Sequence, residues 1–203
     1  MPSNSPLTQN TAAAAIDVPI SIELAATEDP EPSGAAADLA GSPPTTGQDT
    51  AVDAALQQRI QQAVRIAAQS LGFHSGQIGV LVTDDATIQQ INLRHLQHDY
   101  PTDVISFDYH RGDSLVEGEL VVSLGTAQQM AQELQWDWRN ELLLYVIHGT
   151  LHICGLEDST AAQQQQMRLA ERAALVQLGI TDAEPLRCGF ADQSGSDEGT
   201  LER

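Results

Sequence analysis

The spacing of apolar side chains changes several times along the middle of the chain, and each change predicts a new secondary-structure element. In residues 52–71 the apolar positions recur every three to five residues, which is the spacing of the buried face of a helix. Gly72 follows as a natural helix stop. Residues 78–83 (IGVLVT) are a short apolar run typical of a buried strand. The pattern of residues 84–96 predicts a helix whose N-terminus is capped by Asp84 or Asp85.

Extended and helical patterns continue to alternate downstream. We expect extended segments at 102–107 and 119–123, and helices at 125–135, 139–154 and 161–178. A Gly112-Asp113 turn separates the two extended segments. Strands and helices mixed in this order predict an α/β (α+β) fold, in which helices pack over a small mixed sheet.

The ends of the chain differ from the middle. Residues 25–50 are rich in alanine, proline, serine, glycine and acidic residues, and they lack the large apolar side chains that offset the entropy of ordering. Residues 16–24 (IDVPISIEL) alternate as a strand does, and Pro19 confines that strand to a sheet edge. The predicted organisation is a mostly disordered acidic extension at 1–50 that contains this first strand, one folded domain at 51–181 that carries the metal-binding and catalytic residues, and an acidic disordered tail at 182–203.

The charge of the chain is strongly negative. There are 28 acidic and nine basic residues, all nine of them arginine, for a formal net charge of −19. Residues 51–181 hold 15 of the acidic and seven of the basic residues, so this region has a formal net charge of −8. The two ends of the chain carry the remaining negative charge. Proteins that bind free nucleic acid or anionic membranes usually present a basic surface. The composition therefore argues against DNA, a membrane surface and unaided RNA binding.

Three features of the sequence favour a cytoplasmic protein. The longest apolar run, residues 142–147, is far shorter than a membrane-spanning helix. No basic residue precedes Arg59, so the N-terminal segment has the pattern of neither a secretory signal nor a transit peptide. The two cysteines, Cys154 and Cys188, are too few for a disulfide framework, and we expect both to be reduced thiols.

The strongest chemical signal lies at residues 148–158 (HGTLHICGLED). His148 and His152 are four residues apart on a predicted helix, so their imidazoles lie one turn apart on one face, as two ligands of a tetrahedral metal must. Gly155 can end the helix in a left-handed conformation and turn the chain back, which brings Asp158 into reach as a third ligand. Three nitrogen or oxygen ligands and an open fourth position predict a catalytic Zn²⁺ site with one ion per chain.

This motif leaves alternatives open. The histidines could be ordinary core residues, but their spacing, followed by a glycine and a carboxylate, favours a metal site. Glu157 is also a carboxylate and competes with Asp158 for the role of third ligand. A zinc peptidase needs a glutamate after the first histidine as general base, and Gly149 stands there instead. Cys154 points to another side of the helix, and we expect it to be a small buried core residue.

A second motif lies at residues 92–107 (NLRHLQHDYPTDVISF), where Asp103 either shapes the turn before a strand or contacts a ligand. Taken with Gly118-Glu119-Leu120 and the histidine motif, this segment resembles the YbeY family of bacterial endoribonucleases that mature ribosomal RNA. That family has a P-T-D-V-L-S-F strand, a later G-[DE]-[IL] strand and then H-G-x-L-H-L-x-G-y-D-H. The three motifs occur here in the same order and at approximately the same spacing. The likeness covers residues 51–180, and residues 16–24 match the position of the family's first strand.

The resemblance implies a zinc-dependent endoribonuclease that cuts single-stranded RNA. It implies a role in 3′-end maturation of small-subunit (16S) ribosomal RNA and in ribosome quality control, with ribosomal RNA and the small ribosomal subunit or its proteins as partners. His148 and His152 would be zinc ligands and catalytic residues. The family's third histidine falls on Asp158, and the aspartate before it falls on Glu157.

The sequence departs from the family where RNA is handled. The family's N-x-x-Y-R motif keeps its asparagine as Asn92, but its tyrosine falls on His95 and its arginine on Leu96. Arg94 lies two residues before Leu96. The lost arginine and the charge of −8 motivate a second hypothesis, a ribosome-biogenesis factor that binds a protein or an assembled particle and has little nuclease activity of its own.

Overall fold

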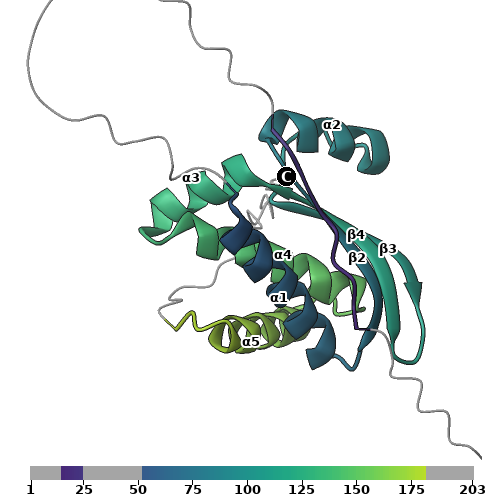
Figure 1. Ribbon diagram of the computed structural model, residues 1–203. Coiled ribbons are helices and arrows are strands. Elements are labelled where there is room, and N and C mark those ends of the chain that lie inside the picture. The colour runs from purple at the N-terminus through teal and green to yellow at the C-terminus, as the bar shows by residue number, and fades with distance from the viewer. Residues whose placement is uncertain (1–14, 25–51, 182–203) are drawn as a thin grey trace, which may run out of the picture.

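The fold is built on one mixed sheet with helices on both of its faces (Figure 1). The structure, a computed structural model, describes residues 15–24 and 52–181. Within these residues the elements are, in chain order, β1 (Ile20–Glu23), α1 (Ala54–Ser70), β2 (Ser75–Thr83), α2 (Asp85–Leu96), β3 (Val104–Arg111), β4 (Leu115–Ser123), α3 (Leu124–Leu134), α4 (Trp138–Ile153) and α5 (Ala161–Gln177). This arrangement confirms the predicted α/β class and the small mixed sheet.

The strands lie in the order β1-β2-β4-β3. β1 and β4 both run parallel to β2, and β3 and β4 form an antiparallel hairpin at the opposite edge. The strand β1 occupies an edge, as Pro19 predicts, because proline has no N–H with which to pair with a second neighbouring strand. The carbonyl of Pro19 still accepts a hydrogen bond from the amide of Val80 at 2.9 Å.

The two faces of the sheet are covered unequally. Alternate residues of β2 and β4, such as Val80, Val82 and Leu120, point into the main core together with α1, α4 and α5. The other face carries a smaller cluster in which Ile88 of α2 packs with the side chains of β3 and β4. Figure 1 shows α1, α4 and α5 gathered on one side of the sheet, with α2 apart from them.

Helix α4 is the centre of the main core. Twelve of its 16 residues are buried, so it is enclosed around most of its circumference, and it contacts α1, α3, α5, β3 and β4. Gly149 permits its close approach to the sheet. A Cβ at this position would lie 2.7 Å from Cδ2 of Leu120, and also 2.9 Å from the side chains of Ser106 and Val104. The helix that carries both histidines is therefore held directly against the first residues of β3.

The observed boundaries agree with the sequence prediction to within about two residues for the five helices given above. The strands extend beyond their apolar runs, because β2 begins at Ser75 and β4 at Leu115, where pairing continues through polar residues. Residues 16–24 contain the four-residue strand β1 and an isolated bridge from Asp17 to Gln77. The predicted linker at 25–50 and tail at 182–203 lie outside the described residues. In the part of the chain that the structure describes, no helix is both long and apolar enough to cross a membrane.

Candidate metal centre

A Schellman motif ends α4 and also positions one candidate ligand. The amide of Leu156 donates to the carbonyl of Leu151 at 2.9 Å, and the amide of Gly155 donates to the carbonyl of His152 at 2.8 Å. Gly155 supplies the left-handed residue of the motif, with φ at 95°. The turn places the Leu156 carbonyl 2.8 Å from Nδ1 of His152. The residues that end the helix therefore also orient the imidazole of His152.

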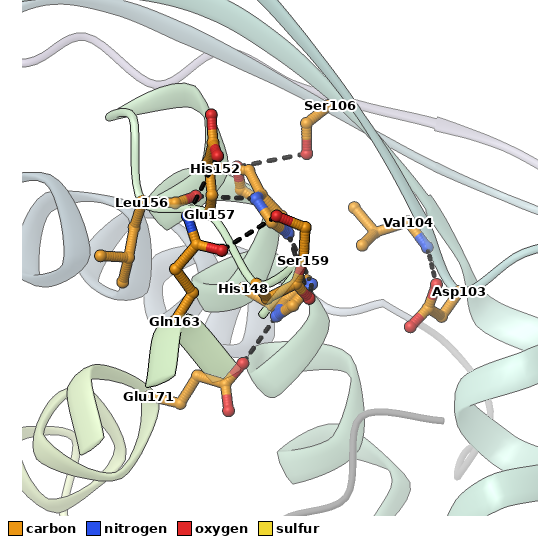
Figure 2. Close-up of polar contacts among 12 residues, drawn as sticks. Asp103, Val104, Ser106, His148, His152, Leu156, Glu157, Ser159, Gln163 and Glu171 are labelled. Atoms are coloured by element: carbon orange, nitrogen blue, oxygen red, sulfur yellow. Dashed lines mark hydrogen bonds and ion pairs between the residues drawn. The ribbon is translucent and has the colours of Figure 1, made fainter. Parts of the chain in front are cut away.

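His148 is oriented by a different element. Its Nδ1 lies 2.6 Å from Oε1 of Glu171, which α5 contributes, and both residues are only 2% exposed. A carboxylate and a backbone carbonyl accept hydrogen bonds, so Nδ1 donates in both histidines and each Nε2 keeps a bare lone pair. Figure 2 shows Glu171 below His148 and the Leu156 carbonyl beside His152, on the outer sides of the two rings.

The two Nε2 atoms and one carboxylate oxygen converge. The Nε2 atoms lie 2.9 Å apart, and Oδ2 of Asp158 lies 3.9 Å from that of His148 and 3.8 Å from that of His152. Atoms with these separations surround a point about 2.1 Å from each, which matches ordinary Zn–N and Zn–O distances. Within residues 15–24 and 52–181, these three residues are the one group of histidine, cysteine and acidic side chains placed to hold a metal ion.

The chemistry of this cluster fits a divalent cation. Two lone pairs that face each other at 2.9 Å beside a carboxylate repel one another unless a proton or a metal ion lies between them. Each imidazole also makes the outer hydrogen bond that is typical of ligating histidines. The side chains of His152 and Asp158 are 27% and 26% exposed, whereas that of His148 is 3% exposed. The centre is therefore closed behind His148 and open to solvent beside Asp158.

The surroundings give the two imidazoles different pKa values. Burial lowers the pKa of His148, but the hydrogen bond and charge of Glu171, with two further carboxylates, outweigh burial and raise it. Burial also lowers the pKa of His152, the neighbouring His148 lowers it further, and Asp158 offsets these effects only in part. A proton that occupies the metal-free centre therefore resides on His148. Because metal binding displaces this proton, higher pH favours binding.

The geometry favours Asp158 over Glu157 as the third ligand. Oε2 of Glu157 accepts a hydrogen bond from Nε2 of Gln163 at 3.2 Å, in the first turn of α5 (Figure 2). Gln163 also forms a capping box with Thr160, so this corner is fixed by the start of the helix. Glu157 is thereby held at the N-terminus of α5, and only the Asp158 carboxylate faces the histidines.

Two other residues singled out from the sequence lie beside the centre without joining it. Cys154 is buried, and burial raises the pKa of its thiol to about 12, so it behaves as the core residue we expected. Oδ1 of Asp103 accepts hydrogen bonds from the Val104 amide at 2.8 Å and from the Thr102 hydroxyl at 2.9 Å. Asp103 thus shapes the turn before β3, and its charge also contributes to the raised pKa of His148.

Sequence reasoning misses two buried acidic residues, of which one contacts the centre. Glu171 orients His148, and Glu141 in the first turn of α4 is fully buried. A signal for Glu171 is present in the sequence, because it shares the buried face of α5 with Met167, Ala174 and Leu175. An acid at an inward position of an amphipathic helix requires a polar partner, and a histidine in the neighbouring helix is a natural one.

The family comparison agrees with the motifs and with the geometry. The family model described as Endoribonuclease YbeY matches residues 45–179, well over half of the chain. The chain belongs to the YbeY family. The matched range contains the P-T-D-V segment, the Gly118-Glu119-Leu120 segment, and all three residues of the metal centre.

Curated proteins named Endoribonuclease YbeY also match this chain. The Endoribonuclease YbeY of Rhodopirellula baltica is 50% identical over 123 residues, which are 60% of this chain and 63% of that protein. That of Chloroherpeton thalassium is 38% identical over 122 residues, which are 60% of this chain and 86% of that protein. The match thus spans less than two thirds of the Rhodopirellula protein. A solution structure of a Thermotoga maritima protein aligns at 20% identity with a TM-score of 0.46, over 68% of this chain and 95% of that one.

Proposed function

We propose that this YbeY family member is a zinc-dependent endoribonuclease that cuts single-stranded RNA. The observation that carries the proposal is the convergence of His148, His152 and Asp158, in a chain whose family and curated relatives are named endoribonucleases. A zinc ion held by these residues would act as a Lewis acid toward the scissile phosphate and would lower the pKa of a bound water.

The protein's own groups prepare the site for this chemistry. Glu171 and the Leu156 carbonyl hold both Nδ1 protons outward, so both Nε2 lone pairs face the centre. His148 closes the rear of the site, and the open side beside His152 and Asp158 admits the RNA. The anionic ligand Asp158 neutralises more charge than a third imidazole would, so we expect a weaker Lewis acid than a three-histidine site provides.

The peptidase alternative finds no support in the position of Gly149. A zinc peptidase places its general base directly after the first histidine, with the carboxylate beside the metal. Here that position faces the sheet, because a Cβ on Gly149 would lie 2.9 Å from the side chains of Val104 and Ser106. The helix thus offers no place for a general base at this position.

The test of the proposed activity is cleavage of a labelled single-stranded RNA fragment by the full chain, with and without a chelator. We expect EDTA to abolish cleavage and added zinc to restore it. His148→Ala should reduce the rate by more than about 100-fold, because even outer partners of metal ligands contribute 10–100-fold. Glu157→Gln serves as the control and should keep the activity. Chelator-resistant cleavage, or full activity in His148→Ala, would contradict the proposal.

We propose further that the RNA is the 3′ region of small-subunit ribosomal RNA precursor, processed in the cytoplasm on or near the small ribosomal subunit. Family membership supports this role. Leu96, at the family's arginine position, is 50% exposed, and the predicted domain carries a charge of −8, so basic ribosomal proteins would supply the missing positive surface. This differs from a pure binding factor, which would co-sediment with ribosomal particles and yet show no zinc-dependent cleavage on them.

A further inference from the structure

A stacked pair of exposed rings lies in the loop between α2 and β3. The rings of His98 and Tyr100 have centroids 5.3 Å apart, and their planes are inclined by 13°. Tyr100 is 55% exposed, and His98 is exposed as well. Because each ring covers only one face of the other, the stack keeps outer ring faces open to solvent. The pair thus presents an aromatic surface that no part of the core covers.

The backbone beneath this pair is anchored at several points. Asn92, which is 2% exposed, donates from Nδ2 to the carbonyl of Tyr100 at 2.8 Å. Gln89 donates to the carboxylate of Asp99 at 2.9 Å, between the two rings in the chain. Pro101 then restricts the backbone directly after the pair. The loop therefore holds the backbone beneath the rings in position before any ligand arrives, which lowers the entropic cost of binding.

A short segment of backbone links the pair to the residues that pack beside helix α4. Val104 packs beside Gly149, the residue after His148 in α4. Tyr100 is four residues before Val104, so their Cα atoms are no more than about 14 Å apart. Asp103, within the same short segment, is close enough to His148 for its charge to act there. A strand of RNA with one phosphate at the metal centre can therefore place a nearby nucleotide over the loop.

We infer that His98 and Tyr100 form a stacking platform for an unpaired nucleobase of the RNA strand that enters the metal centre. The inference rests on the proposed endoribonuclease function. Stacking on aromatic rings is a sequence-tolerant source of affinity for single strands, since every base has a π face. It also needs no positive charge, which suits residues 51–181, whose formal net charge is −8.

Binding is measured by fluorescence anisotropy with labelled single-stranded RNA, in a His148→Ala background that prevents cleavage. We expect Tyr100→Ala and His98→Ala each to weaken binding about 5-fold or more, the range seen when stacking residues are truncated. Tyr100→Phe keeps the ring and should bind within about twofold of its parent. Tyr109→Ala is the matched control, because Tyr109 on β3 is 62% exposed and lies outside the platform. Its affinity should not change.

An abasic scan separates stacking from a general loss of structure. Each base of the RNA is removed in turn. Removal of the base that stacks on the platform should weaken binding to the parent but should not weaken binding to Tyr100→Ala any further. Equal effects in both proteins, unchanged affinity in Tyr100→Ala, or no RNA binding by the parent would overturn the platform. If this coupling is found but the unmutated chain cleaves no RNA, the platform stands and the proposed nuclease function fails.

Discussion

Glu171 illustrates which parts of the metal centre the sequence could reveal and which it could not. The candidate ligands His148, His152 and Asp158 lie on one helix and its following turn, so their spacing alone predicts that they meet. Glu171 lies 23 residues from His148, and their contact depends on how α5 packs against α4. The place of Glu171 on the buried face of α5 indicates that it needs a polar partner, but only the fold shows that this partner is His148.

Replacing Glu171 tests its role as a positioning residue. We expect Glu171→Leu to weaken zinc binding 10–100-fold, because the His148 ring loses the acceptor that fixes its orientation. Glu171→Gln keeps an acceptor oxygen and should lose less. Competition with a fluorescent zinc chelator measures both, and circular dichroism confirms that the variants fold. Zinc affinity in Glu171→Leu within twofold of the parent would show that His148 needs no such support.

Glu141 makes a different prediction, one that concerns stability. It is fully buried, and burial raises its pKa from 4.5 to about 7, although the nearby polar groups of Tyr145 and Trp136 oppose the shift. A carboxyl whose pKa is higher in the folded state binds its proton more tightly there. The free energy of unfolding therefore decreases as pH rises from about 4.5 to about 7.

Glu141→Gln removes this titration and retains the shape of the side chain. We expect the variant to be more stable than the parent by about 3 kcal/mol at pH 8 but by only about 1 kcal/mol at pH 5. Urea unfolding at the two pH values measures the difference. Glu133→Gln, at an exposed site on α3, is the control and should shift neither value. A stability difference for Glu141→Gln that is the same at both pH values would refute this account.

At the scale of elements, the apolar pattern predicts each helix well. Most helices show one apolar face that recurs every turn, whereas α4 shows a nearly continuous apolar run. The pattern does not predict how elements join. We expected Asp84 or Asp85 to cap α2, and Asp84 does so through the Thr87 amide at 2.7 Å. Asp85 instead accepts from the amide of Thr126 at 3.1 Å, at the start of α3. Strand order is likewise invisible in the pattern, since β4 comes between β2 and β3 only through long-range pairing.

The contact between α4 and the sheet depends on Gly149, and a mutation tests it. A Cβ there would meet Leu120 at 2.7 Å, so either this side chain or the helix must shift. We expect Gly149→Ala to lower the free energy of unfolding by about 1–3 kcal/mol, as overpacked core positions do. Gly112→Ala is the control, because a Cβ at Gly112 has no contact closer than 3.5 Å. Equal stability of the two variants would mean that α4 packs less tightly than described.

At the scale of the whole molecule, charge sets how the protein can hold RNA. Each phosphate neutralised on a single strand contributes about 0.7 to the slope of log affinity against log salt. With seven arginines among 15 acidic residues in 51–181, we expect few such contacts and a slope below about 2. Anisotropy titrations at several salt concentrations measure it. A slope of about 4 or more would reveal a basic groove and contradict the stacking account.

The central claim is that His148, His152 and Asp158 hold one metal ion. Isothermal titration of the metal-free full chain with zinc, compared between Asp158→Ala and Glu157→Ala, tests it most directly, since the two carboxylates are neighbours and only one faces the histidines. We expect one zinc per chain in the parent and in Glu157→Ala, and lost or strongly weakened binding in Asp158→Ala. No zinc binding by the parent, or equal binding by the two variants, would contradict the account.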